Sequence, residues 1–318
     1  MCLRKWLFPA AAACSGVLAL LLLTCGNTAA QGVRDGISLC LVSVIPALFP
    51  FFVAAQLLTA LGAAEVLGRA AGPLFRRLFC IDGAGAAAFL LGLLGGYPVG
   101  AKAAGSLVRQ GFLSPEDGAR LLTFCNNAGP AFILGIVGGG VFHSPRAGVW
   151  LYLLHAASAT AVGLLLCRAG GRKPPAVPRT ASVASRRSAV VPVKKPPASL
   201  AAAFIEAVQS GVRAMAGVCG VVIFCLVLLR LAEEALGSLP PLAAGLLELT
   251  NGILRLTPDR RGFITAAGLL GWGGLSVHGQ TAAVLGGSGI SLRRYLPAKA
   301  LQGALSAVLA AAVWRWVL

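Results

Sequence analysis

The sequence predicts an all-α, polytopic membrane protein. Of its 318 residues, 57% are hydrophobic and only 12% are charged, whereas an average soluble domain carries about 25% charged residues. Apolar stretches of about eighteen residues or more recur along the chain, and short alternating segments typical of strands do not. The membrane spans are therefore expected to be helices.

Six apolar runs are long enough to cross the hydrocarbon core as helices. We expect spans near residues 6–26, 37–63, 119–142, 148–168, 212–232 and 297–318. The first run follows Arg4 and Lys5 and lacks a clear small-x-small cleavage pattern. We therefore expect a retained first helix, with a cleaved leader as the alternative.

Two further apolar segments, 83–110 and 262–289, are interrupted by glycine near their middles. The first contains Gly95-Gly96-Tyr97-Pro98, and the second contains Gly271-Trp272-Gly273-Gly274. Such a midpoint cannot remain a continuous helix facing lipid, because its freed backbone groups need protein or water as partners. Both segments are predicted to form re-entrant hairpins.

The net charge of +17 would suggest nucleic-acid binding in a soluble chain. In a membrane chain, basic residues set the orientation and meet anionic headgroups, so we expect membrane lipid and no nucleic acid as a partner. With the N-terminus inside, most Lys and Arg residues fall on the inner side. Residues 169–199 are rich in Pro, Ser and basic residues, and are predicted to form a cytoplasmic linker.

The linker separates two segments with the same order of elements. In both, a span is followed by an amphipathic stretch, a glycine-broken segment and another span, and the two copies have opposite predicted orientations. Interrupted segments at corresponding positions of inverted halves indicate a transport site. The predicted organisation is an N-terminal helix and loop at 1–36, a first repeat at 37–168, the linker, and a second repeat at 200–318.

The first broken segment offers candidate solute contacts at Tyr97, Pro98 and Lys102. Glycines before Tyr97 allow close approach of a ligand, and Pro98 suits the first turn of a returning half-helix whose N–H groups face the tip. Lys102 adds a positive charge, and the combination favours an anion. The alternative for Lys102 is that it extends to the cytoplasmic face.

The span that follows contains Asn126 and Asn127 beside a Gly129-Pro130 break. Amides in an apolar helix need partners, and Pro130 leaves the carbonyl one turn earlier without its helical donor. An opened helix that faces a solute explains both features. The alternative is an amide hydrogen bond between helices.

In the second broken segment, Ser276, His278 and Gln280 follow the glycines and are further candidate solute contacts. A proton-coupled role for His278 is one interpretation, and a structural hydrogen bond is the other. Glu248 and Asn251 are interpreted as part of a helix end. No catalytic motif, nucleotide-binding loop or metal-ligand spacing is present, so we expect no enzyme, cofactor or metal.

Four strings resemble the YlbJ type of sporulation integral membrane protein, which carries two nucleoside recognition (Gate) domains. They are GLLGGYPVGAKAAGSLVRQGFLS (92–114), LLTFCNNAGPAFILGIVGGGVF (121–142), LELTNGI (247–253) and WGGLSVHGQ (272–280). One departure is Gly279, where the family is expected to have Ala. The resemblance implies a fold similar to concentrative nucleoside transporters, with two hairpins and two broken helices around the solute.

The resemblance also implies a role in late spore formation. Members of this type are associated with moving dipicolinic acid across the outer forespore membrane, which places the chain in the bacterial cell membrane as a multi-pass protein. Dipicolinate is therefore the leading solute, and a nucleoside or another small solute is an alternative. A third hypothesis is a non-transporting scaffold of a sporulation membrane complex. Homo-oligomers and sporulation membrane partners stay open.

Overall fold

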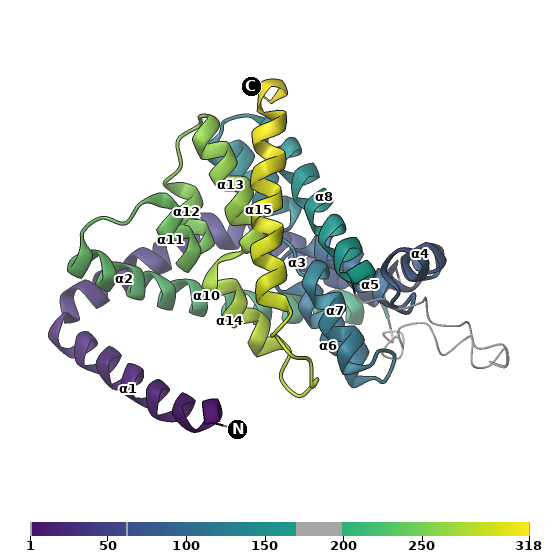
Figure 1. The fold of residues 1–318 in the computed structure, drawn as a ribbon, viewed down its shortest axis with the longest axis horizontal. Coiled ribbons are helices and arrows are strands. Elements are labelled where there is room, and N and C mark those ends of the chain that lie inside the picture. The colour runs from purple at the N-terminus through teal and green to yellow at the C-terminus, as the bar shows by residue number, and fades with distance from the viewer. Residues whose placement is uncertain (1, 62, 170–198, 318) are drawn as a thin grey trace.

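A computed structural model describes residues 2–61, 63–169 and 199–317, whose regular structure is entirely helical (Figure 1). Three of the described helices are long and apolar enough to cross a membrane, namely α8 (Pro145–Ala169), α10 (Leu200–Leu236) and α15 (Tyr295–Val313). The predicted polytopic helical class is confirmed. Nearly all of the predicted linker at 169–199 lies outside the described residues.

The chain begins with α1 (Cys2–Thr24), whose Leu18 packs against a small cluster formed by α2 and α10. It meets the helix that follows at an angle of 95°, and this bent pair counts as a fourth candidate span. The chain then continues through α2 (Gly26–Leu39), the short π-helix η1 (Cys40–Val44) and α3 (Ile45–Ala60). Both α2 and α3 pack against α10, so the N-terminal region covers the long helix of the second half.

The predicted hairpin at 83–110 is present. After the amphipathic α4 (Ala63–Phe79), α5 (Gly85–Gly95) and α6 (Val99–Arg109) pack against each other, joined by a short turn. The two arms cross at glycines, because a Cβ added to Gly100 would lie 3.0 Å from the Cα of Gly92. This close approach of backbones explains why the crossing needs residues without side chains.

The predicted span at 119–142 is divided into two helices. α7 (Pro115–Cys125) begins at Ser114, whose Oγ accepts the N–H of Asp117. The chain is non-helical from 126 to 129 and then forms a π-helix, η2 (Ala131–Val141). The opening occurs at the position that the Gly-Pro pair predicts.

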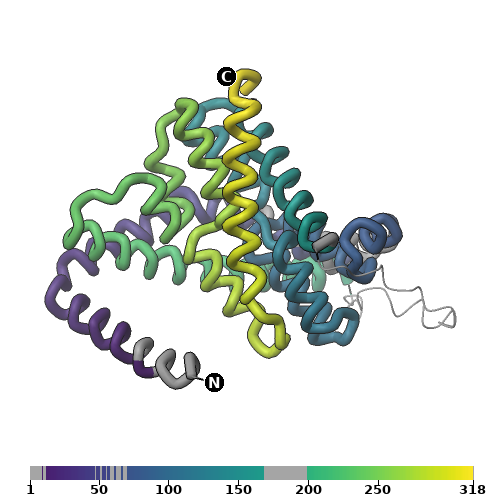
Figure 2. The backbone as a smooth tube through the Cα atoms, viewed as in Figure 1, coloured from purple at the N-terminus to yellow at the C-terminus, as the bar shows by residue number. Residues whose placement is uncertain are grey.

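The segment 262–289 differs from the expected hairpin. Its two helices are α13 (Arg260–Trp272) and α14 (Gly274–Val284). Both contact α11 and α12, but α13 packs along α15 and α8 whereas α14 packs against α6 and α10. In Figures 1 and 2 the chain runs down through α13 and α14, turns, and returns along α15. The segment is a broken helix that continues in one direction.

The packed hairpin of the second half lies earlier in the chain. α11 (Pro241–Leu247) and α12 (Leu249–Leu254) pack against each other, with Gly245 next to Gly252. Each half therefore contains a hairpin, a broken helix and a long helix, in that order. The first set is α5/α6, α7/η2 and α8, and the second is α11/α12, α13/α14 and α15.

This order also changes how the two halves correspond. The matching strings Gly92-Leu93-Leu94-Gly95 and Gly268-Leu269-Leu270-Gly271 lie on different kinds of element, the first on a hairpin arm and the second on a broken helix. The string match is therefore a coincidence of small and apolar residues.

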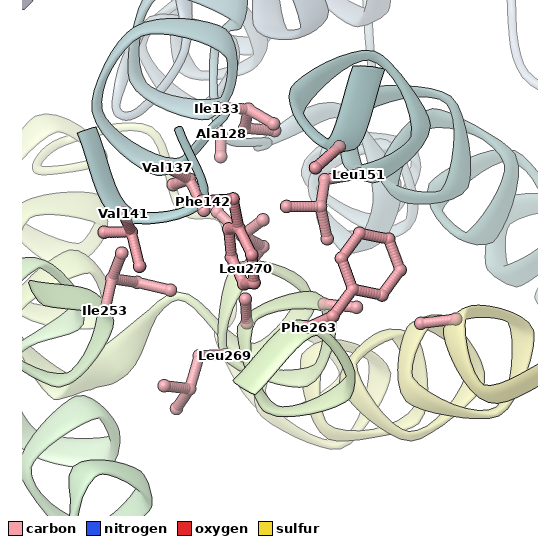
Figure 3. Packing of buried hydrophobic residues seen from close by; sticks show 14 of the residues in the cluster. Ala128, Ile133, Val137, Val141, Phe142, Leu151, Ile253, Phe263, Leu269 and Leu270 are labelled. Carbon is pink, nitrogen blue, oxygen red and sulfur yellow. The ribbon is translucent and has the colours of Figure 1, made fainter. Parts of the chain in front are cut away.

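A buried apolar cluster holds the broken helices of the two halves together (Figure 3). Residues of η2 and α8 meet residues of α12 and α13, and the rings of Phe142 and Phe263 pack edge to face at 5.8 Å between centroids. Val141 and Ile253 extend this contact toward the second hairpin (Figure 3). The cluster fixes both broken helices in the same region of the molecule.

An ion-pair group holds the second hairpin onto α10. Glu233 accepts Arg255, which caps the end of α12, at 2.6 Å, and it also pairs with Arg230 at 3.3 Å. Arg230 in turn binds Asp35 on α2 at 2.7 Å. The group therefore joins three elements at one edge of the fold.

We predict that Gly100→Ala destabilises the protein, whereas Gly279→Ala does not. A Cβ at Gly100 meets the Cα of Gly92 and the carbonyl of Cys125, but a Cβ at Gly279 meets no heavy atom within 4 Å. Overpacking in Gly100→Ala should lower the free energy of unfolding by about 1–3 kcal/mol. In Gly279→Ala, the better helix former should raise it by about 0.5–1 kcal/mol. Thermal unfolding of the purified variants in detergent measures both, and equal unfolding temperatures would contradict the crossing.

Candidate functional site

A partly open cavity of about 60 Å³ lies where the hairpins and broken helices of the two halves meet. Its walls come from both hairpin turns, from the first break, from the first turns of α14, and from α3, η1 and α10. The lining residues are Val44, Leu48, Phe52, Gly95, Gly96, Tyr97, Ala128, Gly129, Phe132, Val218, Val222, Glu248, Leu249, Thr250, Ser276, Val277 and Gln280.

The non-helical segments contact one another through backbone. In the first half, a Cβ added to Gly96 would lie 2.9 Å from the amide nitrogen of Gly129. In the second half, a Cβ added to Gly274 would lie 3.1 Å from the nitrogen of Leu249. Gly96 and Gly274 both have positive φ, at 74° and 80°, a region that L side chains rarely adopt. Glycine at these positions therefore allows both the turn and the contact.

Tyr97 joins the two halves at the cavity. Its hydroxyl donates to the carbonyl of Leu270 at 3.1 Å, near the end of α13. A Cβ on Gly273 would lie 3.1 Å from the same hydroxyl oxygen. The tip of the first hairpin thus reaches the break in the second half.

Three of the predicted site residues line the cavity, namely Tyr97, Ser276 and Gln280. Pro98 is buried, occupies the N-cap position of α6, and does not line the cavity. Ser276 is 2% exposed, and its Oγ has no hydrogen-bond partner among the described residues. A buried hydroxyl without a partner lining a cavity is a candidate ligand contact.

Asn126 and Asn127 are fully buried behind the cavity lining. Asn126 Nδ2 donates to Thr281 Oγ1 at 2.8 Å and to Tyr295 Oη at 3.0 Å. Asn127 Nδ2 donates to the carbonyl of Phe124 at 2.7 Å. The amides bond within the protein, as the interhelical alternative expects, and the adjacent backbone of residues 128 and 129 forms the cavity wall.

His278 is buried beside the cavity but does not line it. Its Nδ1 lies 3.4 Å from Tyr295 Oη, and its ring packs edge to face against Trp272 at 4.4 Å between centroids. His278 Nε2 has no partner among the described residues. Its surroundings fit the structural interpretation, and its predicted solute contact stays a prediction.

Lys102 is exposed on α6 and lies outside the cavity lining. Its Nζ is 3.3 Å from Ser210 Oγ on α10. The structure therefore does not bring Lys102 together with Tyr97 and Ser276.

Glu248 is an acidic residue of the cavity lining that the sequence analysis interpreted only as part of a helix end. It is 2% exposed and lies between α11 and α12 at the hairpin turn. Its carboxylate accepts the backbone N–H groups of Thr250 and Asn251, at 3.1 and 2.7 Å, and the side-chain amide of Asn251. Glu248 is thus both an N-cap and a charged group of the cavity.

Lys299 on α15 is a second charged residue that the sequence analysis missed. It is fully buried, and its Nζ lies 5.4 Å from the centroid of the Tyr97 ring. The sequence did indicate Lys299 as a candidate, because an ionisable residue such as Lys within the apolar run 297–318 is costly in a membrane unless it has a role. His155 was missed for the same reason, and its Nε2 accepts the N–H of Ala128 at 3.1 Å.

The N-terminus of α14 gives the cavity a positive end. The helix begins at Gly274, no side chain caps it, and Ser276 in its first turn lines the cavity. The first N–H groups of a helix and its dipole favour an anion or a polar oxygen at that end. The cavity therefore offers an apolar wall, one carboxylate, and one uncapped helix N-terminus.

We predict that Asn127→Leu destabilises the protein, whereas Ser276→Ala does not. Loss of the Asn127 amide leaves Phe124 O and Gln302 Nε2 without their partner, which should cost about 1–3 kcal/mol for each buried group. Removal of the unpartnered Ser276 hydroxyl should leave stability unchanged or slightly raised. Thermal unfolding in detergent checks the pair, and a stable Asn127→Leu protein would show that the break does not depend on this amide.

Comparison with known proteins identifies two similarities. Residues 41–142 match the Gate family model, described as nucleoside recognition, and this region covers the first hairpin and broken helix. The sporulation integral membrane protein YlbJ of Bacillus subtilis (strain 168) is 27% identical, over 89% of this chain and 76% of its own length. No solved structure matches the chain significantly.

The model match covers one Gate domain, so the second Gate domain, expected in the other half, stays a prediction. The similarity to YlbJ extends over most of the chain. The resemblance seen in the sequence motifs is therefore confirmed: the chain is a relative of the YlbJ-type sporulation integral membrane proteins and carries a nucleoside recognition (Gate) domain in its first half.

Proposed function

We propose that this protein carries a small organic solute across the membrane by binding it in the cavity between its two halves. The observation that supports this most is the meeting of both hairpin turns, the first break and the start of α14 around one space. Irregular backbone at membrane depth is tolerated where it is buried in protein or lines a water-filled cavity. Paired broken helices that meet between repeats are the arrangement of a transport site.

The leading solute is dipicolinate, a small planar dianion, as the family resemblance implies. The uncapped N-terminus of α14 and the free hydroxyl of Ser276 would receive one carboxylate. The buried ammonium of Lys299, behind Tyr97, adds positive charge near the cavity. In this proposal Lys299 supplies the attraction that the sequence analysis assigned to Lys102.

A nucleoside is the second candidate, and Glu248 favours it. A carboxylate in the lining can accept hydrogen bonds from ribose hydroxyls, and it repels a dianion. Glu248 places such an acidic residue at the turn of the second hairpin. The description of the Gate family as nucleoside recognition points the same way.

The proposed location is the bacterial cell membrane, and the outer forespore membrane during sporulation. This location follows from the proposed role in spore formation. A scaffold of a sporulation membrane complex is the alternative from a different class, and it would need no solute in the cavity.

Uptake into liposomes tests transport directly. Liposomes with the purified protein should accumulate labelled dipicolinate faster than empty liposomes, and unlabelled dipicolinate should compete. Labelled uridine under the same conditions measures the second candidate. If the liposomes accumulate uridine but not dipicolinate, the proposed substrate changes to a nucleoside. If they accumulate neither solute, the scaffold hypothesis is favoured.

Two variants of the lining distinguish the solutes. Ser276→Ala should raise the KM for dipicolinate about 10-fold, because it removes one hydrogen bond to a charged group, worth about 1.5 kcal/mol. Glu248→Gln keeps the side-chain size, removes the negative charge, and should raise dipicolinate uptake while lowering nucleoside uptake. Arg293→Gln on an exposed turn is the matched control and should leave both unchanged. Equal loss of both solutes in Glu248→Gln would assign Glu248 to the hairpin structure alone.

A further inference from the structure

Lys299 is a fully buried cation without an acidic partner. It lies on α15 with 0% exposure, and no ion pair joins it to a carboxylate within the described chain. A buried ammonium without a counter-charge is costly unless its hydrogens find good acceptors. The acceptors around Lys299 therefore indicate what the site is built to hold.

The first acceptor is the carbonyl that the helix break sets free. Pro130 has no N–H, so the carbonyl four residues earlier, that of Asn126, loses its helical donor. Lys299 Nζ donates to this oxygen at 3.0 Å. The ammonium thus occupies the open position of the broken helix.

The second acceptor is oriented by a chain of amides. Asn127 Nδ2 donates to the carbonyl of Phe124 at 2.7 Å, which leaves Asn127 Oδ1 to accept Gln302 Nε2 at 3.2 Å. The Gln302 oxygen then faces Lys299, and the distance from Nζ to Oε1 is 2.6 Å. The face of the Tyr97 ring, with its centroid 5.4 Å from Nζ, is on the cavity side.

This set resembles a binding site for a small cation. A freed backbone carbonyl and a side-chain amide oxygen are ligands that alkali ions use at unwound helices of transporters. In this protein the position is filled by a charge that is covalently attached to α15. The chain therefore places a tethered amino group against two oxygen ligands of the kind that bind small cations.

We propose that the Lys299 ammonium is a tethered cation that takes the place of a free coupling ion, so that solute moves without Na⁺ or K⁺. The part of this inference that concerns solute flux rests on the proposed transport function. The binding of a cation between Asn126, Gln302 and Tyr97 is independent of the solute. Net movement of the solute then needs no alkali-ion gradient.

Ion replacement in liposomes tests the effect on flux in the unmodified protein. Replacing Na⁺ and K⁺ on both sides by N-methyl-D-glucamine should change uptake of the transported solute by less than about 2-fold. Loss of a required ion would instead lower uptake about tenfold or more, which corresponds to about 1.4 kcal/mol. A tenfold or greater fall that Na⁺ or K⁺ restores would overturn the proposal.

Removal of the side chain tests the site without any solute. Lys299→Ala should unfold at a lower temperature than the unmodified protein in detergent, because Asn126 O and Gln302 Oε1 lose their donor. Millimolar methylammonium or Na⁺ should raise its unfolding temperature by several degrees by entering the vacated space. Lys299→Met fills that space with an apolar chain and is the matched control, which these cations should not stabilise.

The outcomes separate the two proposals. Selective stabilisation of Lys299→Ala by small cations supports the tethered cation even if neither dipicolinate nor uridine is transported. Unchanged stability of Lys299→Ala without added cation, or equal stabilisation of Lys299→Met, overturns it. If Lys299→Ala does not yield folded protein, the ion-replacement measurement on the unmodified chain decides the proposal alone.

Discussion

The need to satisfy every backbone polar group inside the membrane governs this structure. Its helices are interrupted at two breaks and two hairpin turns, and each interruption frees N–H or carbonyl groups that lipid cannot bind. Side chains from distant helices supply the partners. Lys299 binds the freed carbonyl of Asn126, His155 accepts the N–H of Ala128, and Tyr97 donates to Leu270. Because these partners come from α8, α15 and the first hairpin, the breaks depend on the packing of the whole fold.

The parts of the fold set by backbone chemistry were predictable. Pro130 marks the opened helix, and Gly95-Gly96-Tyr97-Pro98 marks the first hairpin turn, because few other residues allow these conformations. The second hairpin was placed wrongly at 262–289, since glycines alone do not distinguish a turn from a break in a continuing helix. The actual hairpin at α11 and α12 has arms too short to stand out as apolar segments. Its position is set by packing against α13 and α14.

The candidate site was only partly predictable, because residues that line the cavity and residues that hold the helix break look alike in sequence. Tyr97, Ser276 and Gln280 line the cavity, whereas Asn126 and Asn127 hold the break from behind. Both kinds of residue are polar groups beside glycine in an apolar context, and only three-dimensional contacts separate them. Lys299 lies about one hundred and seventy residues from its acceptor Asn126. No local pattern relates two positions that far apart, although the isolated charge itself was visible.

The bond between Tyr97 and Leu270 has a mechanical consequence. It is the link by which the tip of the first hairpin is attached to the end of α13, and it joins two uncharged groups. A neutral hydrogen bond of this kind contributes about 1 kcal/mol, which thermal motion overcomes often. The phenolic hydroxyl therefore orients the hairpin tip against α13, whereas the cohesion of the two halves resides in the buried apolar cluster.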